Sequence, residues 1–185
     1  MSITTESIPG YRVGTWVIDP THTEVGFSVR HLAISKVKGK FETFSGTLVT
    51  AENPLDSKVE ATVQVASINT NQADRDGHLR TGDFFAAEEY PEFTFVSTGV
   101  REQGGDYFVD GDLTLRGVTK PVTFAFEFGG FGQDGYGQYK AGFTATTKVN
   151  REDFGIQWNA PLETGGLLLG NEVTITLDVQ ATLQQ

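Results

Sequence analysis

The sequence alternates apolar and polar residues with a period of two along most of its length. The clearest case lies near the C-terminus, where Val173, Ile175, Leu177 and Val179 alternate with polar neighbours. Because successive side chains of a strand point to opposite faces, this alternation predicts strands with one buried side and one solvent-facing side. About eight segments show the pattern, at residues 24–31, 40–50, 58–65, 92–95, 109–116, 122–128, 141–149 and 173–183.

The connections between these segments predict how the strands pair. Most are short and rich in turn-forming residues, such as Asn53-Pro54 and Gly104-Gly105, and short links favour antiparallel neighbours. One connection, residues 69–91, is long and lacks the alternation; we expect a helical turn or two within 72–83, packed over one end of the sheet. About eight antiparallel strands form either a sandwich or a closed barrel, and a barrel of that size has room for one small ligand.

Composition and charge bound the domain organisation and exclude several functions. No change of composition divides the chain, so residues 1–185 predict a single domain, with 1–13 as an extension. With 14 Lys and Arg against 24 Asp and Glu, the formal net charge is −10, which argues against nucleic-acid binding and disfavours docking on an anionic membrane. The absence of cysteine excludes disulfides and zinc–sulfur sites. Lacking a signal-peptide pattern and an apolar run of about 20 residues, the chain is expected to be cytoplasmic, without a membrane span.

Phenylalanine is unusually frequent, with 14 residues beside 22 glycines. Half of the rings fall on the apolar face of predicted strands, and they form either a packed aromatic core or the lining of an apolar cavity. These rings are Phe27, Phe93, Phe95, Phe124, Phe126, Phe128 and Phe143.

Motifs for cofactors, metals and catalysis are weak. Residues 130–135 match a Gly-x-Gly-x-x-Gly dinucleotide pattern, but the glycines precede another alternating segment where the motif requires a helix, so we interpret them as a hairpin. The three histidines lack the spacing typical of metal ligands, and no Gly-x-Ser-x-Gly elbow occurs. We therefore expect no cofactor, no metal site and no catalytic residue.

Ionisable residues gather in the long connection, in the run Arg75-Asp76-x-His78-Leu79-Arg80. One interpretation is a structural cap, in which arginine and aspartate pair with each other and with backbone groups of the sheet. The other is a polar collar at the mouth of a cavity. Trp158 lies in a second segment without alternation, residues 150–170.

A series of motifs resembles the YceI-like family of polyisoprenoid-binding proteins. The resemblance runs in order over roughly residues 14–183. Its motifs are Trp16-x-Ile18-Asp19-Pro20-x-His22, Gly39-x-Phe41-x-x-Phe44-x-Gly46, Arg75-Asp76-x-His78-Leu79-Arg80, Asp83-Phe84-Phe85, Tyr90-Pro91-x-Phe93-x-Phe95, Gly117-Val118-Thr119-Lys120-Pro121 and Asn150-Arg151-x-Asp153-Phe154-Gly155-Ile156-x-Trp158.

The resemblance implies a fold and a function. The fold would be an all-β, eight-stranded antiparallel lipocalin-like barrel with a short helical segment around residues 70–90. The function would be the non-enzymatic binding, transport or storage of a long-chain amphipathic lipid, a polyisoprenoid first of all, although the family also accepts fatty-acid-type and amide lipids and some members form homodimers. Two alternatives stay open: a structural or stress-response interaction module without a lipid, and an enzyme that acts on a lipid headgroup through His78 and Asp76.

Strand parity and the resemblance together predict the residues that contact the lipid. Parity places the apolar tail against one set of side chains, namely Phe27, Val29, Phe93, Phe95, Phe124, Phe126, Phe143 and Trp158. The resemblance, with the position of the long connection, assigns the polar end to His31, Arg75, Asp76 and His78.

Overall fold

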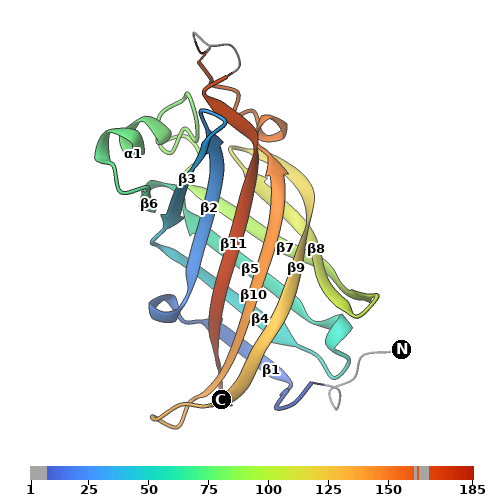
Figure 1. Ribbon diagram of the computed structural model, residues 1–185. Coiled ribbons are helices and arrows are strands. Elements are labelled where there is room, and N and C mark those ends of the chain that lie inside the picture. The colour runs from blue at the N-terminus through green and yellow to red at the C-terminus, as the bar shows by residue number, and fades with distance from the viewer. Residues whose placement is uncertain (1–7, 161, 163–166) are drawn as a thin grey trace.

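The protein forms an antiparallel β-barrel in a computed structural model that describes residues 8–160, 162 and 167–185 (Figure 1). The described part contains eleven strands and one short α-helix. The strands are β1 (Gly14–Ile18), β2 (Glu24–His31), β3 (Ser35–Phe41), β4 (Phe44–Thr50), β5 (Lys58–Gln64), β6 (Ile68–Asn69), β7 (Glu92–Gln103), β8 (Asp106–Leu115), β9 (Val118–Gln133), β10 (Tyr139–Asn150) and β11 (Leu169–Leu183). The helix α1 spans Ala73–Leu79, and short 3₁₀ turns span Pro20–His22, Pro54–Asp56, Val65–Ser67 and Arg151–Phe154.

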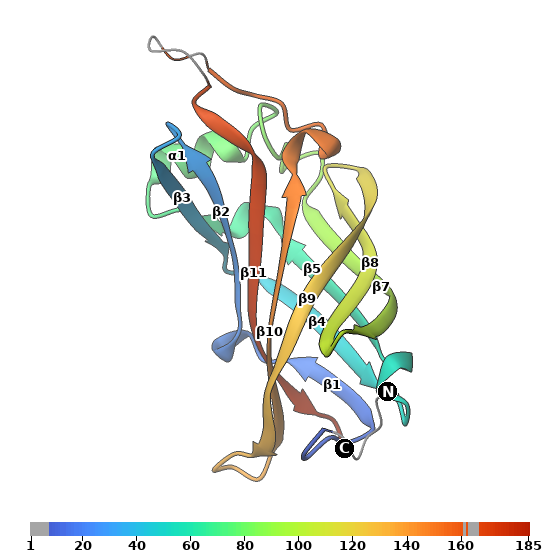
Figure 2. The ribbon, with the colours of Figure 1, turned by 45° about the vertical axis from the view of Figure 1, so that its right-hand side comes forward.

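Eight of the described strands close into a ring, in the order β1-β4-β5-β7-β8-β9-β10-β11 with β1 paired back to β11. The closure uses only the C-terminal end of β11, where Trp16 lies opposite Leu183 and Ile18 opposite Ala181. The N-terminal part of β11 pairs with β2 instead, and β2, β3 and β6 continue the sheet there. Figures 1 and 2 show the result: β1 crosses one end of the barrel, while β2, β3 and α1 lie at the other.

The predicted barrel and its short helix are confirmed, since α1 falls inside the expected 72–83 segment. The glycine-rich residues 130–135 lie in β9 and the turn before β10, as the hairpin interpretation requires. Two strand predictions were wrong. Residues 40–50 do not form one strand, because the chain turns at Glu42-Thr43 between β3 and β4. Strand β1 was missed, because its five residues carry too short an alternation to be recognised without their partners on β4 and β11.

The predicted N-terminal extension falls partly outside the described residues, which begin at Ile8. From there the chain packs onto the barrel: Ile8 is buried, the hydroxyl of Tyr11 donates to the carbonyl of Ala51 at 2.7 Å, and the hydroxyl of Tyr139 donates to the carbonyl of Gly10. These contacts hold residues 8–11 against the barrel.

Two clusters of buried apolar side chains lie towards opposite ends of the barrel. One is built by the segments beside α1 and after β10, and comprises Phe84, Leu113, Leu115, Phe154 and Ile156. The other surrounds the closing strand β1, where Trp16 packs on Ala141 and Ala181. The interior between the two clusters holds the candidate site.

Candidate functional site

A cavity of about 440 Å³ lies inside the barrel. Its lining reaches from Leu115 and Trp158, in and beside the first cluster, to Phe131 and Ala141 at the second. Along β11 it extends from Leu169 to Val179, a path of roughly 33 Å at about 3.3 Å per residue. The cavity is therefore elongated along the barrel.

The side chains predicted to contact a lipid tail all line this cavity. They are Phe27, Val29, Phe93, Phe95, Phe124, Phe126, Phe143 and Trp158. Of the predicted polar end, His31, Arg75 and His78 line it as well. On β2, β7, β9 and β10, the face that the period-two rule predicted to be apolar therefore faces the cavity, and Phe128 lines it as well.

The aromatic rings form the cavity wall by packing against one another. Phe95 meets Phe124 edge to face at 5.3 Å between ring centroids, and Phe41 meets Phe93 at 5.0 Å. Such pairs add about 0.5–1.5 kcal/mol each beyond the area they bury. The two interpretations of the phenylalanines are therefore both partly correct, because the rings pack and still leave a cavity.

Glycines allow two of these rings to lie flat against the sheet. Phe27 faces Gly39 across the β2–β3 pair, and the Phe95 ring lies over Gly111 on β8. A Cβ atom at either glycine would overlap the ring. The excess of phenylalanine and the excess of glycine are thus linked at these two positions, where a ring occupies the space of a missing side chain.

His78 lies at the end of the cavity nearest α1. Its ring packs edge to face on Phe84 and Trp158, at 5.1 and 4.9 Å between centroids, and its Nε2 lies 2.8 Å from Oδ2 of Asp83. Arg75 is anchored beside it, because Nε and Nη2 donate to the hydroxyl and the carbonyl of Thr70 at 2.8 and 2.6 Å. Histidine and arginine therefore present fixed polar groups at one end of an apolar space.

Asp76 does not join them. It is buried outside the cavity lining, and its Oδ1 accepts hydrogen bonds from the backbone N–H of Thr70 at 2.9 Å and from the Thr70 hydroxyl. Asp76 therefore ties α1 to β6, which is the capping role, and the partner of His78 is Asp83. His78 and Asp76, which the enzyme alternative combines, therefore have different partners.

Arg151 is a cavity residue that the sequence did not single out. It is only 5% exposed, and it donates from Nε to the Gly170 carbonyl at 2.9 Å and from Nη1 to the carbonyls of Ile156 and Trp158 at 3.1 and 2.8 Å. Burial lowers its pKa from the ordinary value. Within the described residues its Nη2 has no hydrogen-bond partner. The signal was present in the Asn150-Arg151 motif, but only the fold shows that the arginine holds Trp158 in the cavity wall.

The charges of the lining all have one sign. Among the described residues, the lining contains Lys58, Arg75 and Arg151 but no aspartate or glutamate, although the chain as a whole carries −10. Cationic groups that line a cavity without a carboxylate in the same lining favour an electron-rich or anionic oxygen over a cationic group. The described part of the chain also holds no group of three or more residues suited to a metal ion.

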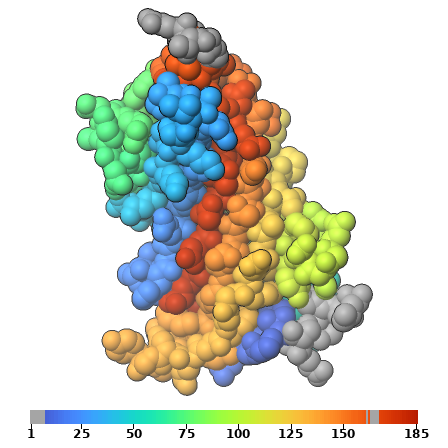
Figure 3. All heavy atoms as spheres, viewed as in Figure 1, coloured from blue at the N-terminus to red at the C-terminus, as the bar shows by residue number. Residues whose placement is uncertain are grey.

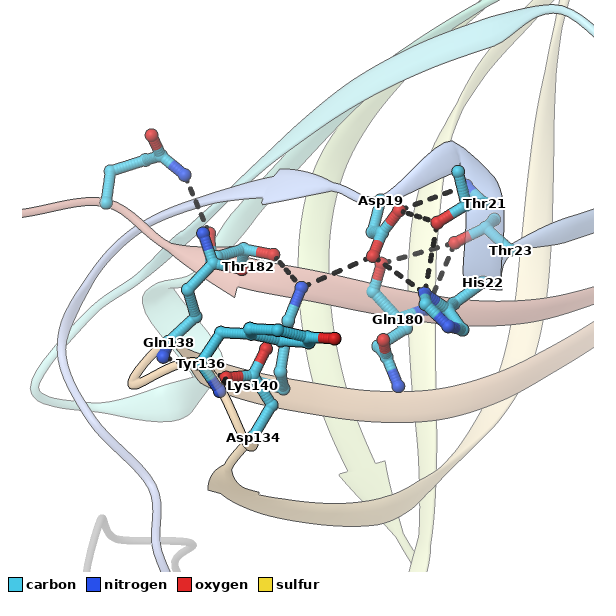
Figure 4. A network of polar contacts seen from close by, with 11 residues as sticks. Asp19, Thr21, His22, Thr23, Asp134, Tyr136, Gln138, Lys140, Gln180 and Thr182 are labelled. Atoms are coloured by element: carbon cyan, nitrogen blue, oxygen red, sulfur yellow. Dashed lines mark hydrogen bonds and ion pairs between the residues drawn. The ribbon is translucent and has the colours of Figure 1, made fainter.

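A second polar network joins the turn after β1 to β10 and β11 (Figure 4). Asp19 accepts from the Thr21 hydroxyl at 2.7 Å, its Oδ2 lies 2.9 Å from His22 Nδ1, and Lys140 donates to it at 3.3 Å and to the Thr182 hydroxyl at 2.6 Å. Thr21 and Asp19 both contact Nδ1 of His22, whereas a catalytic triad needs nucleophile and acid on opposite ring nitrogens. The network is therefore a structural clamp.

Asp19 makes the clamp sensitive to acid. The hydrogen bonds from Thr21, followed by that from His22, lower the pKa of Asp19 well below its ordinary value of 3.8. A carboxylate whose pKa falls on folding stabilises the protein above the unfolded pKa, and this contribution disappears as the pH falls through the folded value. We expect Asp19→Asn to lower the free energy of unfolding at pH 7 by on the order of 1 kcal/mol.

The difference in the free energy of unfolding between wild type and Asp19→Asn should shrink once the pH falls below about 4, near the ordinary carboxyl pKa of 3.8. Urea denaturation at several pH values measures it. Asp56→Asn, on the exposed 3₁₀ turn after β4, is a matched control that should show no such pattern. A difference that stayed constant from neutral to acidic pH would contradict the role given to the Asp19 charge.

Comparison with known proteins identifies relatives that are similar in sequence and in fold. The profile of one family, described as the YceI-like domain, matches residues 16–181. A UPF0312 protein of Photorhabdus laumondii is 47% identical over 134 residues, covering 72% of this chain and 70% of that protein. A UPF0312 protein of Vibrio parahaemolyticus is 46% identical over 151 residues, covering 80% of each. The protein YceI of Escherichia coli O157:H7 is 44% identical over 137 residues, covering 74% and 72%.

Solved structures agree on the architecture. The YCEI protein of Campylobacter jejuni is 32% identical, with a TM-score of 0.72 over 90% of this chain and 96% of that one. A polyisoprenoid binding domain from Saccharophagus degradans, implicated in plant cell wall breakdown, shares 14% identity and a TM-score of 0.70, covering 94% and 100%. At that identity the second likeness shows the fold alone.

Proposed function

The chain belongs to the YceI-like family, and from this premise we propose that it binds one long-chain amphipathic lipid inside its barrel and carries or stores it unchanged. A polyisoprenoid is the first candidate, because the neighbour from Saccharophagus degradans is a polyisoprenoid binding domain. The observation that carries the proposal is the elongated apolar cavity of about 440 Å³.

The volume supports a ligand of about twenty carbon atoms. An engineered cavity of about 150 Å³ holds one benzene ring, so a space nearly three times larger accommodates roughly eighteen carbons, or three to four isoprene units. Burial of one five-carbon unit contributes about 3–4 kcal/mol at roughly 0.8 kcal/mol per CH₂. Three or four units reach about −12 kcal/mol, the nanomolar range, before the cost of ordering the chain.

The polar groups at one end orient the lipid. We infer that its headgroup lies near His31, Arg75 and His78, which line the cavity beside Trp158. Because no carboxylate of the described residues lines this space, a hydroxyl, carbonyl or anionic headgroup is favoured over an amine. Asp76 does not belong to this group, because its carboxylate accepts hydrogen bonds from Thr70.

The two alternatives have less support. An enzyme acting through His78 and Asp76 would need those side chains together, and they have separate partners in Asp83 and Thr70. An interaction module with a filled barrel would have no internal space, whereas the interior holds the cavity described above. Among the described residues no helix is both long and apolar enough to cross a bilayer.

Native mass spectrometry tests the proposal directly. We expect the gently purified protein, stripped of bound lipid and mixed with the C20 prenyl alcohol geranylgeraniol, to gain the mass of one molecule. Geraniol, with half the chain length, should bind at least a hundredfold more weakly, because about ten carbons of burial are lost. Equal retention of the two alcohols, or no mass gain with either, would contradict binding in the elongated cavity.

A further inference from the structure

The hairpin between β2 and β3 carries exposed aliphatic side chains at its tip. Ile34 is 83% exposed, and Leu32 is exposed beside it. The backbone N–H of Leu32 donates to the carbonyl of Leu168 at 2.9 Å, which places the exposed Leu167 next to the same tip. Figure 3 shows the hairpin segment in mid-blue on the surface of the molecule, between the green segment that contains α1 and the orange C-terminal segments.

The turn at this tip does not use the residues that its backbone favours. Leu32 and Ala33 lie in the three-residue connection between His31 and Ser35 and have φ angles of 57° and 59°, the left-handed region that glycine and asparagine adopt most readily. Residues with a Cβ atom are strained there, and such strain points to a role other than folding. The exposed leucine is therefore retained at a cost in stability.

Basic side chains extend from the tip along the outer face of the hairpin. Arg30, Lys36, Lys38 and Lys40 are all exposed on the outer face of the hairpin, and no acidic residue occurs between Glu24 and Glu42. Arg30 lies directly opposite Lys36 in the β2–β3 register, an arrangement of like charges that destabilises a sheet. None of the four takes part in an ion pair within the described residues.

We propose that this hairpin docks the protein on an anionic lipid bilayer: Leu32 and Ile34 enter the interface, and the four basic side chains contact lipid phosphates. Apolar side chains bordered by lysine and arginine are the pattern of interfacial membrane binding. The apolar interior of a bilayer accommodates an exposed aliphatic tip of any shape, whereas an acidic protein partner would need an apolar groove that matches the shape of the tip. The bilayer is therefore favoured over a protein.

The net charge of −10 does not prevent this docking. Charges are screened over about 8–10 Å at physiological ionic strength, and the fifteen residues of β11 span roughly 50 Å. The acidic groups at the β1 end of the barrel, such as Asp19 and Asp134, are thus several screening lengths from the hairpin, whereas Asp83 and Glu172 lie at the hairpin's own end. The sequence-based expectation that the acidic chain avoids anionic membranes treated the charge as evenly spread, and the fold concentrates four cations on one hairpin.

Docking would bring one end of the cavity to the bilayer. His31, at the end of β2, and Leu168 and Leu169, which join it, line the cavity next to the hairpin. The docking proposal does not depend on the lipid-binding proposal, because the exposed aliphatic and basic side chains of the hairpin lie outside the cavity lining. Its test therefore uses lipid-free protein, and a negative result would leave the cavity proposal unchanged.

Vesicle co-sedimentation tests the docking. We expect the lipid-free protein to bind vesicles of phosphatidylcholine with phosphatidylglycerol at low salt, to be released as salt is raised, and not to bind pure phosphatidylcholine. Ile34→Asp should weaken binding at least tenfold by placing a charge in the interface. Its matched control is Tyr136→Asp at the β9–β10 turn, where Tyr136 is 93% exposed; this variant should bind as wild type does.

A second pair of variants separates local charge from net charge. Lys38→Glu and Lys120→Glu both change the formal net charge from −10 to −10 − 2 = −12, and both lysines are exposed. Because one basic group near an anionic surface contributes roughly fivefold in binding, Lys38→Glu should weaken binding on the order of tenfold or more, and Lys120→Glu far less. Equal losses in the two variants, or no vesicle binding by the wild type, would overturn the proposal, the latter leaving an acidic protein as the partner of the hairpin.

Discussion

Phe126→Asp is expected to abolish the binding of geranylgeraniol. Phe126 lies on β9, lines the cavity and packs on Tyr107 and Phe128 at 5.6 and 5.4 Å between ring centroids. When an apolar ligand binds, a carboxylate at this position must either lose its water or become protonated. Either change weakens binding by several kcal/mol. We therefore expect at least a hundredfold loss of affinity, measured by native mass spectrometry or calorimetry.

The next residue on the strand provides the control. Ala125 does not belong to the cavity lining, so Ala125→Asp adds the same charge to the other face of β9 and should bind the alcohol as wild type does. Ala145→Phe is a second variant, which fills the cavity from β10 without adding charge and should also lose binding. Full binding by Phe126→Asp or by a well-folded Ala145→Phe would show that the lipid is not held in the cavity.

Trp16→Ala is expected to cause the largest loss of stability, about 3–5 kcal/mol. Trp16 is fully buried, its indole N–H donates to the Thr50 hydroxyl at 2.9 Å, and its ring contacts Phe131 and Tyr139. The substitution opens a void in the cluster that surrounds β1 and removes a buried hydrogen bond. Urea denaturation measures the loss.

Two further variants test the role of Trp16 in barrel closure. Val17, the next residue of β1, is exposed, so Val17→Ala should cost well under 1 kcal/mol, as is usual for surface substitutions. Trp16→Phe keeps an aromatic ring but loses the donor to Thr50 and part of the ring volume, so its cost should fall between the two. If Trp16→Ala were no more destabilising than Val17→Ala, the cluster around β1 would not be what holds the barrel closed.

The cavity lining was largely predictable because strand parity is a local property. The alternation around Phe126 or Phe143 needs only a few neighbours in sequence, and every ring predicted to face inward lines the cavity. The family resemblance added the choice of a closed barrel over a sandwich, and the lipid. Neither required knowledge of which strands are paired.

Contacts that depend on how the chain folds back on itself were not predictable in the same way. Strand β1 depends on pairing with β4 and with the end of β11. Asp76 was expected at the cavity, but Thr70, six residues earlier, binds it instead. Arg151 donates hydrogen bonds to the carbonyls of Trp158 and Gly170. The net charge of the whole chain does not show that four basic residues lie on one hairpin.

The sequence by itself determined which face of each strand is apolar, because the two faces of a strand follow directly from the alternation of residues. Only the tertiary structure decided whether the phenylalanines fill the interior or surround a space. An internal space is the difference between the volume enclosed by eight strands, set by their closure through β1 and β11, and the volume of the side chains inside. The first of these volumes is a property of the whole ring, and here the ring leaves a cavity of about 440 Å³.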